Sequence, residues 1–192
     1  MTHPFRIFRT ALAYAVLVVV PFGAASAQES PRLDVPFVPT PQETVERMLA
    51  MAKVGPNDYL IDLGSGDGRI PITAAKKYGI RAMGVDLNPV RIKESIENAK
   101  KEGVADKVEF KEQNLFETDI SKATVLTMYL LPDVNLQLRP KILSTLKPGT
   151  RVVSHAFTMG DWKPDQESTG PDGRNHVYMW IVPDPAKGMP KQ

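Results

Sequence analysis

The stretch Y-L-I-D-L-G-S-G-D-G-R-I, residues 59–70, decides the fold of this chain. It opens with an apolar run that is short enough for one buried strand, and the residues after its last glycine are compatible with a helix. Gly64, Gly66 and Gly68 stand at alternate positions, and glycine lets the backbone turn sharply and approach a ligand because it has no Cβ. The free N–H groups at the start of the following helix point towards that ligand. The stretch therefore predicts a strand, a tight loop and a helix around a nucleotide-type pocket.

Acidic residues indicate which ligand this pocket takes. The third glycine comes one residue too early for the dinucleotide fingerprint G-x-G-x-x-G. A pyrophosphate on the loop would also meet Asp62 and Asp67, and like charges at close range cost free energy. S-adenosylmethionine carries a sulfonium and an ammonium group, which suit an acid at the strand end. Asp86 follows about 20 residues later, where such folds place a carboxylate for ribose hydroxyls. A glycine-rich turn without a ligand is the alternative interpretation.

The motifs D-L-G-S-G-D-G and G-V-D resemble motif I and its acidic partner in class I S-adenosylmethionine-dependent methyltransferases. Further segments, V-P-F-V-P-T-P, N-L-F-E-T-D, Y-L-L-P-D-V-N and L-K-P-G-T-R-V-V-S-H, extend the resemblance from residue 35 to about residue 162. Together they resemble small bacterial methyltransferases that are often exported. They are also similar to the lysine methyltransferases that modify the ATP synthase c-subunit. The resemblance implies S-adenosyl-L-methionine as cofactor, and a protein lysine or a small molecule as methyl acceptor.

Strand-like and helix-like segments alternate along residues 41–185, which we expect to form one methyltransferase domain. This alternation predicts an α/β fold with a mostly parallel sheet and helices on both faces. A turn at residues 170–173 predicts a C-terminal antiparallel hairpin, and the resemblance implies a seven-stranded Rossmann-like sheet. Thr40 and Glu43 predict a capping box at the start of the first helix. Pro140 is expected to split the helix predicted at residues 133–146.

The cofactor site is expected at the carboxyl ends of the parallel strands, where open α/β sheets bind ligands. The residues predicted there are Asp62, Gly64, Ser65, Gly66, Asp67, Gly68, Asp86, Leu87, Asn88, Asn114 and Leu115. By resemblance, an acid at the third strand end accepts a hydrogen bond from the adenine amino group. This chain has Asn114 there, whose side-chain carbonyl can accept one such bond.

Polar groups near the ends of the later strands are the candidates for contact with the methyl acceptor. These are Tyr129, Asp133 and His155. Each has a structural alternative: a strand residue, a helix N-cap and a core histidine with satisfied hydrogen bonds, respectively. Methyl transfer is an in-line displacement by a neutral nucleophile, so positioning in a dry pocket supplies much of the rate and a strong base is optional.

The first 27 residues predict a secretory signal peptide. Arg6 and Arg9 precede an apolar run from Ala11 to Val20, and A-S-A at residues 25–27 matches a cleavage site after Ala27. The apolar run is shorter than the roughly 20 residues of a membrane span. An uncleaved anchor is the alternative. We expect an exported, periplasmic or cell-envelope protein, in which residues 28–40 form an extended tether and residues 186–192 a tail.

Composition restricts the remaining classes of function. The whole chain has 24 basic and 22 acidic residues, and the two arginines of residues 1–27 have no acidic counterpart there, so residues 28–192 are neutral. Neutrality disfavours nucleic acid as a partner. Cysteine is absent and histidine is scarce, which disfavours a metal site. We expect a monomer. A non-catalytic binder of S-adenosylmethionine remains an alternative, since export separates the chain from the cytosolic source of that compound, and a nicotinamide dehydrogenase is disfavoured by the glycine spacing.

Overall fold

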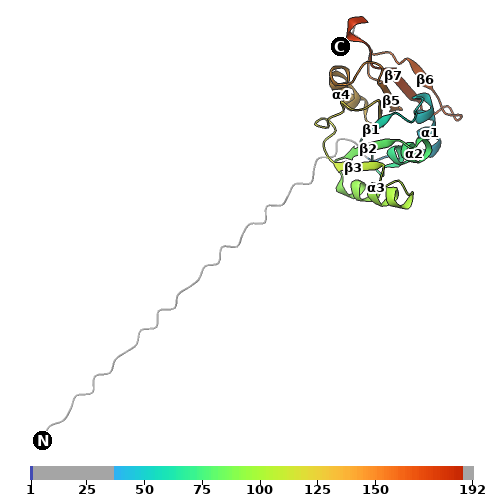
Figure 1. Cartoon of the computed structure of the whole chain (residues 1–192). Coiled ribbons are helices and arrows are strands. Elements are labelled where there is room, and N and C mark those ends of the chain that lie inside the picture. Colours follow the sequence, from blue (N-terminus) through green and yellow to red (C-terminus); the bar gives the residue numbers. More distant parts are fainter. Residues whose placement is uncertain (2–36, 188–192) are drawn as a thin grey trace. The chain divides into compact units, whose positions relative to one another are not determined.

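The computed structural model describes residue 1 and residues 37–187 (Figure 1). The predicted signal peptide, most of the predicted tether and the end of the predicted tail lie outside the described residues. The strands are β1 (Tyr59–Leu63), β2 (Arg81–Asp86), β3 (Val108–Glu112), β4 (Val125–Met128), β5 (Arg151–His155), β6 (Gln166–Ser168) and β7 (Val177–Ile181). The helices are α1 (Gln42–Met51), α2 (Arg69–Tyr78), α3 (Pro89–Lys101), α4 (Pro132–Thr145) and the short 3-10 helix η1 (Pro185–Lys187).

The strands form one seven-stranded sheet in the order β3-β2-β1-β4-β5-β7-β6. All pairings among β1 to β5 are parallel, whereas β7 runs antiparallel to both β5 and β6. The predicted α/β fold with a C-terminal antiparallel hairpin is therefore confirmed. The strand order reverses between β1 and β4, and this switch point is where such sheets bind ligands.

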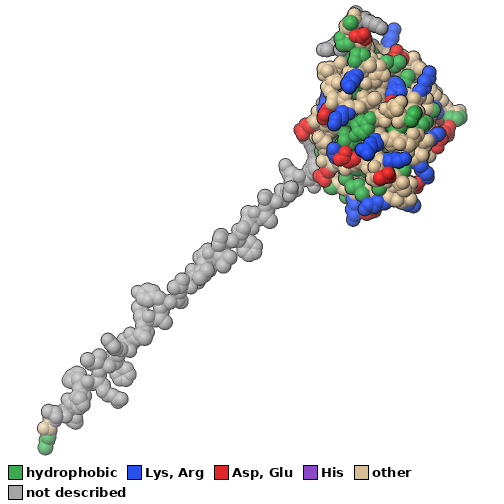
Figure 2. Space-filling model, in the orientation of Figure 1, with side chains coloured by type: hydrophobic (Ala, Val, Ile, Leu, Met, Phe, Trp, Pro, Cys, Tyr) green, Lys and Arg blue, Asp and Glu red, His purple; other side chains and the backbone are tan. Residues whose placement is uncertain are grey.

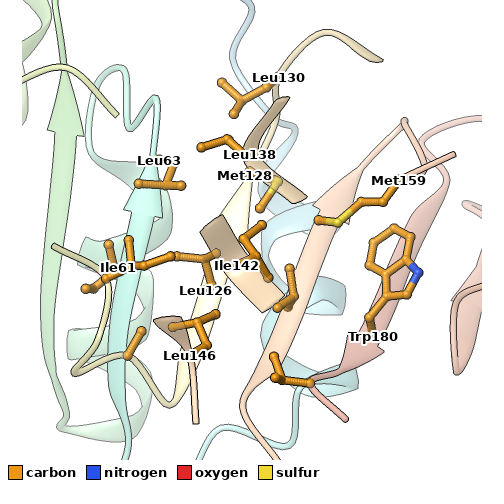
Figure 3. Close-up of a cluster of buried hydrophobic side chains, with 14 of the residues drawn as sticks. Ile61, Leu63, Leu126, Met128, Leu130, Leu138, Ile142, Leu146, Met159 and Trp180 are labelled. Carbon is orange, nitrogen blue, oxygen red and sulfur yellow. The ribbon is translucent and has the colours of Figure 1, made fainter. Parts of the chain in front are cut away.

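Helices cover both faces of the sheet because successive strand residues point to opposite sides. Leu60 of β1 packs in a cluster with the buried residues of α1 and α2, whereas its neighbour Ile61 packs in a second cluster with α4. Figure 3 shows the second cluster, in which Leu138 and Ile142 of α4 lie against the sheet. Helix α3 packs beside α2. The two apolar layers hold the strand ends, and the loops that follow them, in fixed positions.

Two local predictions were wrong. Helix α1 begins at Gln42 after Pro41, with no side-chain cap, so the capping box of Thr40 and Glu43 does not form. The Thr40 hydroxyl instead contacts the His155 side chain of β5. Pro140 lies inside the continuous 14-residue helix α4 rather than splitting it. Proline removes one backbone donor, and the buried face of α4 keeps the helix in place through contacts that do not depend on that bond.

Within residues 37–187, no helix is long and apolar enough to cross a membrane. The same residues contain no group of three or more histidine, aspartate or glutamate side chains arranged to hold a metal ion.

Candidate functional site

The glycine loop between β1 and α2 forms the floor of the site. Gly64, Gly66 and Gly68 all have positive φ angles, of 74°, 53° and 81°, in the region that other residues rarely adopt. The N–H groups of Gly64 and Ser65 both donate to the Val85 carbonyl of β2, at 2.9 Å each. The loop is therefore held against the next strand while its upper surface faces a cleft.

Asp86 at the end of β2 fixes the geometry of this loop. One of its carboxylate oxygens accepts the Gly66 N–H and the other accepts the Asn88 N–H, both at 2.9 Å. Each oxygen keeps a second lone pair for a ligand. Asn88 in turn caps α3 by accepting the Val90 N–H at 3.0 Å. The carboxylate is thus oriented before any ligand arrives.

Residues 37–40, which we call the strap, form one wall of the cleft. The Phe37 ring lies over Gly66, where any added Cβ would collide with it, and the Arg91 guanidinium lies over the Phe37 ring at 4.7 Å. The Arg69 side chain bridges the strap and the loop, because it donates to the Thr40 carbonyl at 2.8 Å and pairs with Asp67. The strap is therefore part of the site rather than a free tether.

A cleft of mixed charge opens between the glycine loop, the strap and the end of β4. It is lined by Phe37, Val38, Pro39, Thr40, Asp62, Gly64, Ser65, Gly66, Asp67, Arg69, Ile70, Asp86, Asn88, Arg91, Tyr129 and Leu130. Asp67 is neutralised by Arg69, with an Nε to Oδ1 distance of 2.9 Å. Asp62 and Asp86 have no such cationic partner among the described ion pairs and give the cleft its acidic character.

Asp62 lies at the centre of the acidic cleft and is 2% exposed. Burial raises the pKa of its carboxyl to about 8, the hydrogen bond from Thr127 at 2.7 Å opposes that rise, and the nearby Asp86 and Asp67 carboxylates add to it. The free protein therefore holds a proton on Asp62 at neutral pH. A cation placed beside this carboxyl would reverse the effect and favour its ionised form.

An apolar slot adjoins the acidic cleft on the side of β3. It is lined by Gly64, Val85, Asp86, Leu87, Gln113, Asn114, Leu115, Phe116, Leu130 and Val134. The Asn114 side-chain carbonyl accepts the Phe116 N–H at 2.9 Å, so the turn already uses the acceptor that we expected to serve adenine. One lone pair of that oxygen and the amide NH₂ remain for a ligand. The slot offers apolar walls for a flat ring and polar groups at its edge.

Residues just after β4 line the cleft, and the end of β5 lies behind them. Tyr129 lines the acidic cleft, and its ring centroid lies 3.9 Å from that of His155. His155 is 2% exposed and does not line the cleft. Its Nδ1 lies 3.2 Å from Thr40 Oγ1 and its Nε2 lies 3.2 Å from Asn175 Oδ1. Burial lowers the pKa of His155, the hydrogen bond to Asn175 opposes this, and the charge of Arg47 lowers it further.

Most of the residues predicted for the cofactor come together in these two hollows. Gly68 does not line either of them; it precedes α2, and an added Cβ there would collide with Phe110 and Ser95. Asp133 is exposed in the first turn of α4 and is also absent from both linings, although its neighbour Val134 lines the apolar slot. His155 lies one layer behind the cleft wall.

Several residues around the site are absent from the predicted site residues. Arg91 lines the cleft and Asn175 lies behind it, and both come from distant parts of the chain. The strap had two signals: residues 39–42 were expected either to cover the pocket mouth or to begin a plain packing helix, and V-P-F-V-P-T-P belongs to the family resemblance. Asn175 precedes β7 and adopts a positive φ of 51°. Nothing in its local sequence distinguishes it from an ordinary turn residue.

The two hollows fit a ligand with an adenosine part and a cationic tail. They meet at Gly64, Asp86 and Leu130, so the Asp86 carboxylate lies between the apolar slot and the acidic cleft, where a ribose would lie. Ser65 Oγ is buried in the acidic cleft, and within residues 37–187 it has no hydrogen-bond partner. An orphaned buried hydroxyl is costly, which indicates that a ligand completes this site.

Together, the strand order and this cleft define the class of protein: it is an S-adenosylmethionine-dependent methyltransferase. The model of the ANTKMT methyltransferase domain matches residues 62–166, and the chain belongs to this family.

Named relatives support this assignment. A protein-lysine N-methyltransferase of Saccharolobus islandicus is 50% identical over 151 residues, which are 77% of this chain and 94% of the relative. The human lysine N-methyltransferase of the ATP synthase c-subunit is 34% identical over 159 residues, covering 81% of this chain and 67% of the relative. A crystal structure described as an RNA methyltransferase from Salinibacter ruber, in complex with S-adenosyl-L-homocysteine, is 50% identical, with a TM-score of 0.76, and covers 81% of this chain and 98% of that one.

Proposed function

We propose that this chain is a protein-lysine N-methyltransferase. The relative that carries the proposal is the protein-lysine N-methyltransferase of which this chain covers 94% at 50% identity. The cleft supports it, because Phe37 and Tyr129 offer apolar walls for an aliphatic side chain and Thr40 offers an oxygen to an amine. A lysine fits these features, since it combines a four-carbon stem with a terminal nitrogen.

The linings of the two hollows suggest how S-adenosylmethionine is oriented in the site. We infer that the adenine lies in the apolar slot beside Leu87, Asn114 and Leu115, and that Asp86 accepts from the ribose hydroxyls. Asp62 then lies beside the cationic methionine part, and Gly64, Ser65, Gly66, Asp67 and Asn88 line the path between them. The bound cofactor supplies the methyl group. The acceptor nitrogen forms the new N–C bond as the C–S bond breaks, and the electron pair of the broken C–S bond stays on sulfur.

The protein's own residues hold the acceptor and exclude water. Tyr129 forms the wall beside the methyl end of the cleft, packed against His155 behind it and near Phe157, with a ring separation of 6.4 Å to the latter. The strap closes the opposite wall. A dry, shaped site of this kind accelerates methyl transfer mainly by positioning the two reacting atoms.

RNA is the second candidate acceptor, because the Salinibacter ruber structure carries that description at 50% identity. The balance of 24 basic and 22 acidic residues in the chain favours protein instead. Figure 2 shows Lys and Arg side chains interspersed with Asp and Glu over the face in view, without the continuous basic patch that a nucleic-acid surface needs.

The deciding experiment incubates the purified full chain with methyl-labelled S-adenosylmethionine and two acceptor pools. One pool is bacterial protein extract treated with ribonuclease, and the other is protein-free total RNA. We expect label in the protein pool, recovered as Nε-methyl-lysine after acid hydrolysis. Label confined to RNA, or to another amino acid, would overturn the proposal. The Asp86→Ala variant is the matched control for cofactor-dependent labelling.

We further propose that residues 1–27 direct export of the protein. The support is the sequence pattern of two arginines, an apolar run and the A-S-A site. Mass spectrometry of the protein recovered from cell fractions tests this. A mature N-terminus at Gln28 in the exported fraction is expected, whereas an intact chain in the cytosolic fraction would contradict export.

A further inference from the structure

Three polar side chains are connected behind the cleft wall. Thr40 of the strap, His155 at the end of β5 and Asn175 before β7 form one continuous line of hydrogen bonds. Thr40 and His155 are 4% and 2% exposed. Thr40 alone of the three lines the acidic cleft. Thr40 and His155 are 115 positions apart in the sequence, and His155 and Asn175 are 20 positions apart. Residues from distant parts of the chain thus surround the Thr40 hydroxyl.

The Asn175 side chain determines which nitrogen of His155 carries the proton. Its oxygen, Oδ1, faces Nε2, and a carbonyl oxygen can only accept a hydrogen bond. In the tautomer that satisfies this contact, Nε2 carries the hydrogen of the neutral ring and Nδ1 is an acceptor. The Thr40 hydroxyl must then donate its hydrogen to Nδ1, since an acceptor nitrogen lies 3.2 Å from its oxygen.

Asn175 is itself held in place. Its backbone carbonyl accepts a hydrogen bond from Arg47 of α1 at 2.5 Å, and its backbone adopts a positive φ of 51°, which is uncommon outside glycine. Ala156, directly after His155, also has a positive φ, of 67°. Such conformations persist only where the surrounding structure determines them, and they are found at functional sites.

We propose that Thr40 is a positioning residue for the nucleophilic nitrogen, and that His155 and Asn175 orient its hydroxyl so that only oxygen lone pairs face the cleft. In this orientation Thr40 Oγ1 accepts an N–H of the acceptor amine. The nitrogen lone pair is then free to point at the methyl carbon. This inference rests on the proposed amine acceptor, which it extends by naming the group that aligns it.

The opposite orientation of the hydroxyl would block the reaction. When His155 gains a second proton, Nδ1 becomes a donor and bonds to Thr40 Oγ1. The Thr40 hydrogen must then turn towards the cleft, where it donates to the nitrogen lone pair that should attack the methyl group. The charged or titratable groups that face His155 are Arg47 on α1 and the Tyr129 phenol after β4. The charge of Arg47 favours the neutral ring.

The protonation of His155 determines how the activity should depend on pH. Burial and Arg47 lower the pKa of His155 below its usual 6.5, so the ring is neutral and the hydroxyl is correctly oriented above that pH. Activity is expected to fall as the pH drops through the lowered pKa of His155. Protonation of a lysine acceptor adds its own dependence, but that contribution is common to the wild type and to variants of Thr40.

The first test reads the tautomer directly and needs no turnover. Nitrogen-15 NMR of the full chain with labelled histidine should show His155 Nε2 protonated and Nδ1 unprotonated at pH 7.5, with a titration midpoint below 6.5. His155 is assigned from the signal lost in His155→Gln. The reverse tautomer, or a ring protonated at pH 7.5, would overturn the proposal.

The second test separates positioning from folding through matched variants. Thr40→Val keeps the shape and removes the hydroxyl, and we expect the rate of Nε-methyl-lysine formation at saturating extract protein to fall about 10- to 100-fold. Thr40→Ser should restore most of the rate. Thr169→Val is the control, because Thr169 makes the same kind of contact with His176 Nδ1, at 3.0 Å, at an exposed position outside the cleft.

The outcomes distinguish this inference from the proposed function. Unchanged rate and unchanged low-pH loss in Thr40→Val, with lysine still methylated, would overturn the role of Thr40 and leave the function standing. Loss of cofactor binding in Thr40→Val, measured by calorimetry, would show that Thr40 maintains the structure of the strap. That result would also overturn its role in positioning the acceptor nitrogen. A wild type that binds the cofactor but methylates no amine would overturn the proposed function and, with it, the inference.

Discussion

Asp62 is placed where its presence weakens the fold of the free protein. Its carboxyl is buried against Thr127 and two other carboxylates, and burial raises its pKa to about 8 from 3.8. The unfolded chain releases this proton near pH 4 and the folded chain near pH 8. The free energy of unfolding therefore falls as the pH rises between these values. Such a cost is typical of functional sites, where stability is given up for binding.

Replacing the Asp62 carboxyl should separate its cost to stability from its contribution to cofactor binding. We expect Asp62→Asn to keep the acceptor for Thr127 and to raise the free energy of unfolding by about 1–3 kcal/mol at pH 8. The same variant should bind S-adenosylmethionine more weakly, because no ionised carboxylate meets the cation. Urea unfolding at pH 5 and pH 8 and calorimetric titration measure both. Asp133→Asn, an exposed acid outside the cleft, is the control, and equal destabilisation at both pH values would contradict the argument.

Asp86 has a different role, because its two oxygens already hold two backbone N–H groups. We expect Asp86→Ala to weaken binding of S-adenosylmethionine by about 1–3 kcal/mol, the cost of leaving ribose hydroxyls unpaired. Asp86→Asn keeps one acceptor and should lose less. Calorimetric titration of the full chain checks this, and an affinity equal to that of the wild type would remove Asp86 from the cofactor site.

For single residues, the sequence predicts those roles that depend on neighbours along the chain. Asp62 and Asp86 were identified because one precedes a glycine motif and the other follows at the spacing of a ribose-binding acid. Thr40 was interpreted as a helix cap because capping is the local use of a threonine before a proline and a glutamate. Its actual partner is 115 positions away, and no local pattern can reveal that contact.

The glycine loop and the strap build the site, and they pack so closely at Gly66 that no side chain fits between them. Gly66→Ala would introduce strain at a φ of 53° and a collision with Phe37, so we expect it to displace the strap and abolish cofactor binding. Gly173→Ala is the matched control, because Gly173 has a φ of 71° and open space around its missing Cβ.

The two glycine variants should share the cost of a left-handed residue, about 1–2 kcal/mol of stability. Only Gly66→Ala should lose binding of S-adenosyl-L-homocysteine in a calorimetric titration. If both variants bound the ligand normally, the strap would not be a wall of the cofactor site.

Prediction at the level of elements succeeded where periodicity is strong and failed where tertiary packing decides. The sheet and its closing hairpin followed from alternating apolar runs separated by turns. Pro140 was expected to divide a helix on its local chemistry alone. Val134, Leu138 and Ile142 keep α4 continuous because all three are buried against the sheet. The energy of that contact is not visible in a window of a few residues.

For the whole molecule, the ligand should act as a folding partner. The cleft joins the strap, the glycine loop and the ends of β2 and β4, so a bound ligand contacts segments from residue 37 to residue 130. We expect S-adenosyl-L-homocysteine at 100 times its dissociation constant to raise the free energy of unfolding by about 2.7 kcal/mol. Thermal unfolding with and without the ligand measures this. NAD at the same concentration should produce no change, and equal stabilisation by NAD would contradict the choice of cofactor.

The contact between Thr40, His155 and Asn175 also has a consequence for the growing polypeptide on the ribosome. The methyl-donor half of the site is encoded between residues 37 and 130, whereas the side chain that sets the histidine tautomer is among the last to be translated. A chain that ends at β4 holds most of the residues that line the acidic cleft, but not the His155 and Asn175 side chains that, on the proposed role of Thr40, orient its hydroxyl. Alignment of the acceptor nitrogen would then await translation of β7 and its pairing with β5.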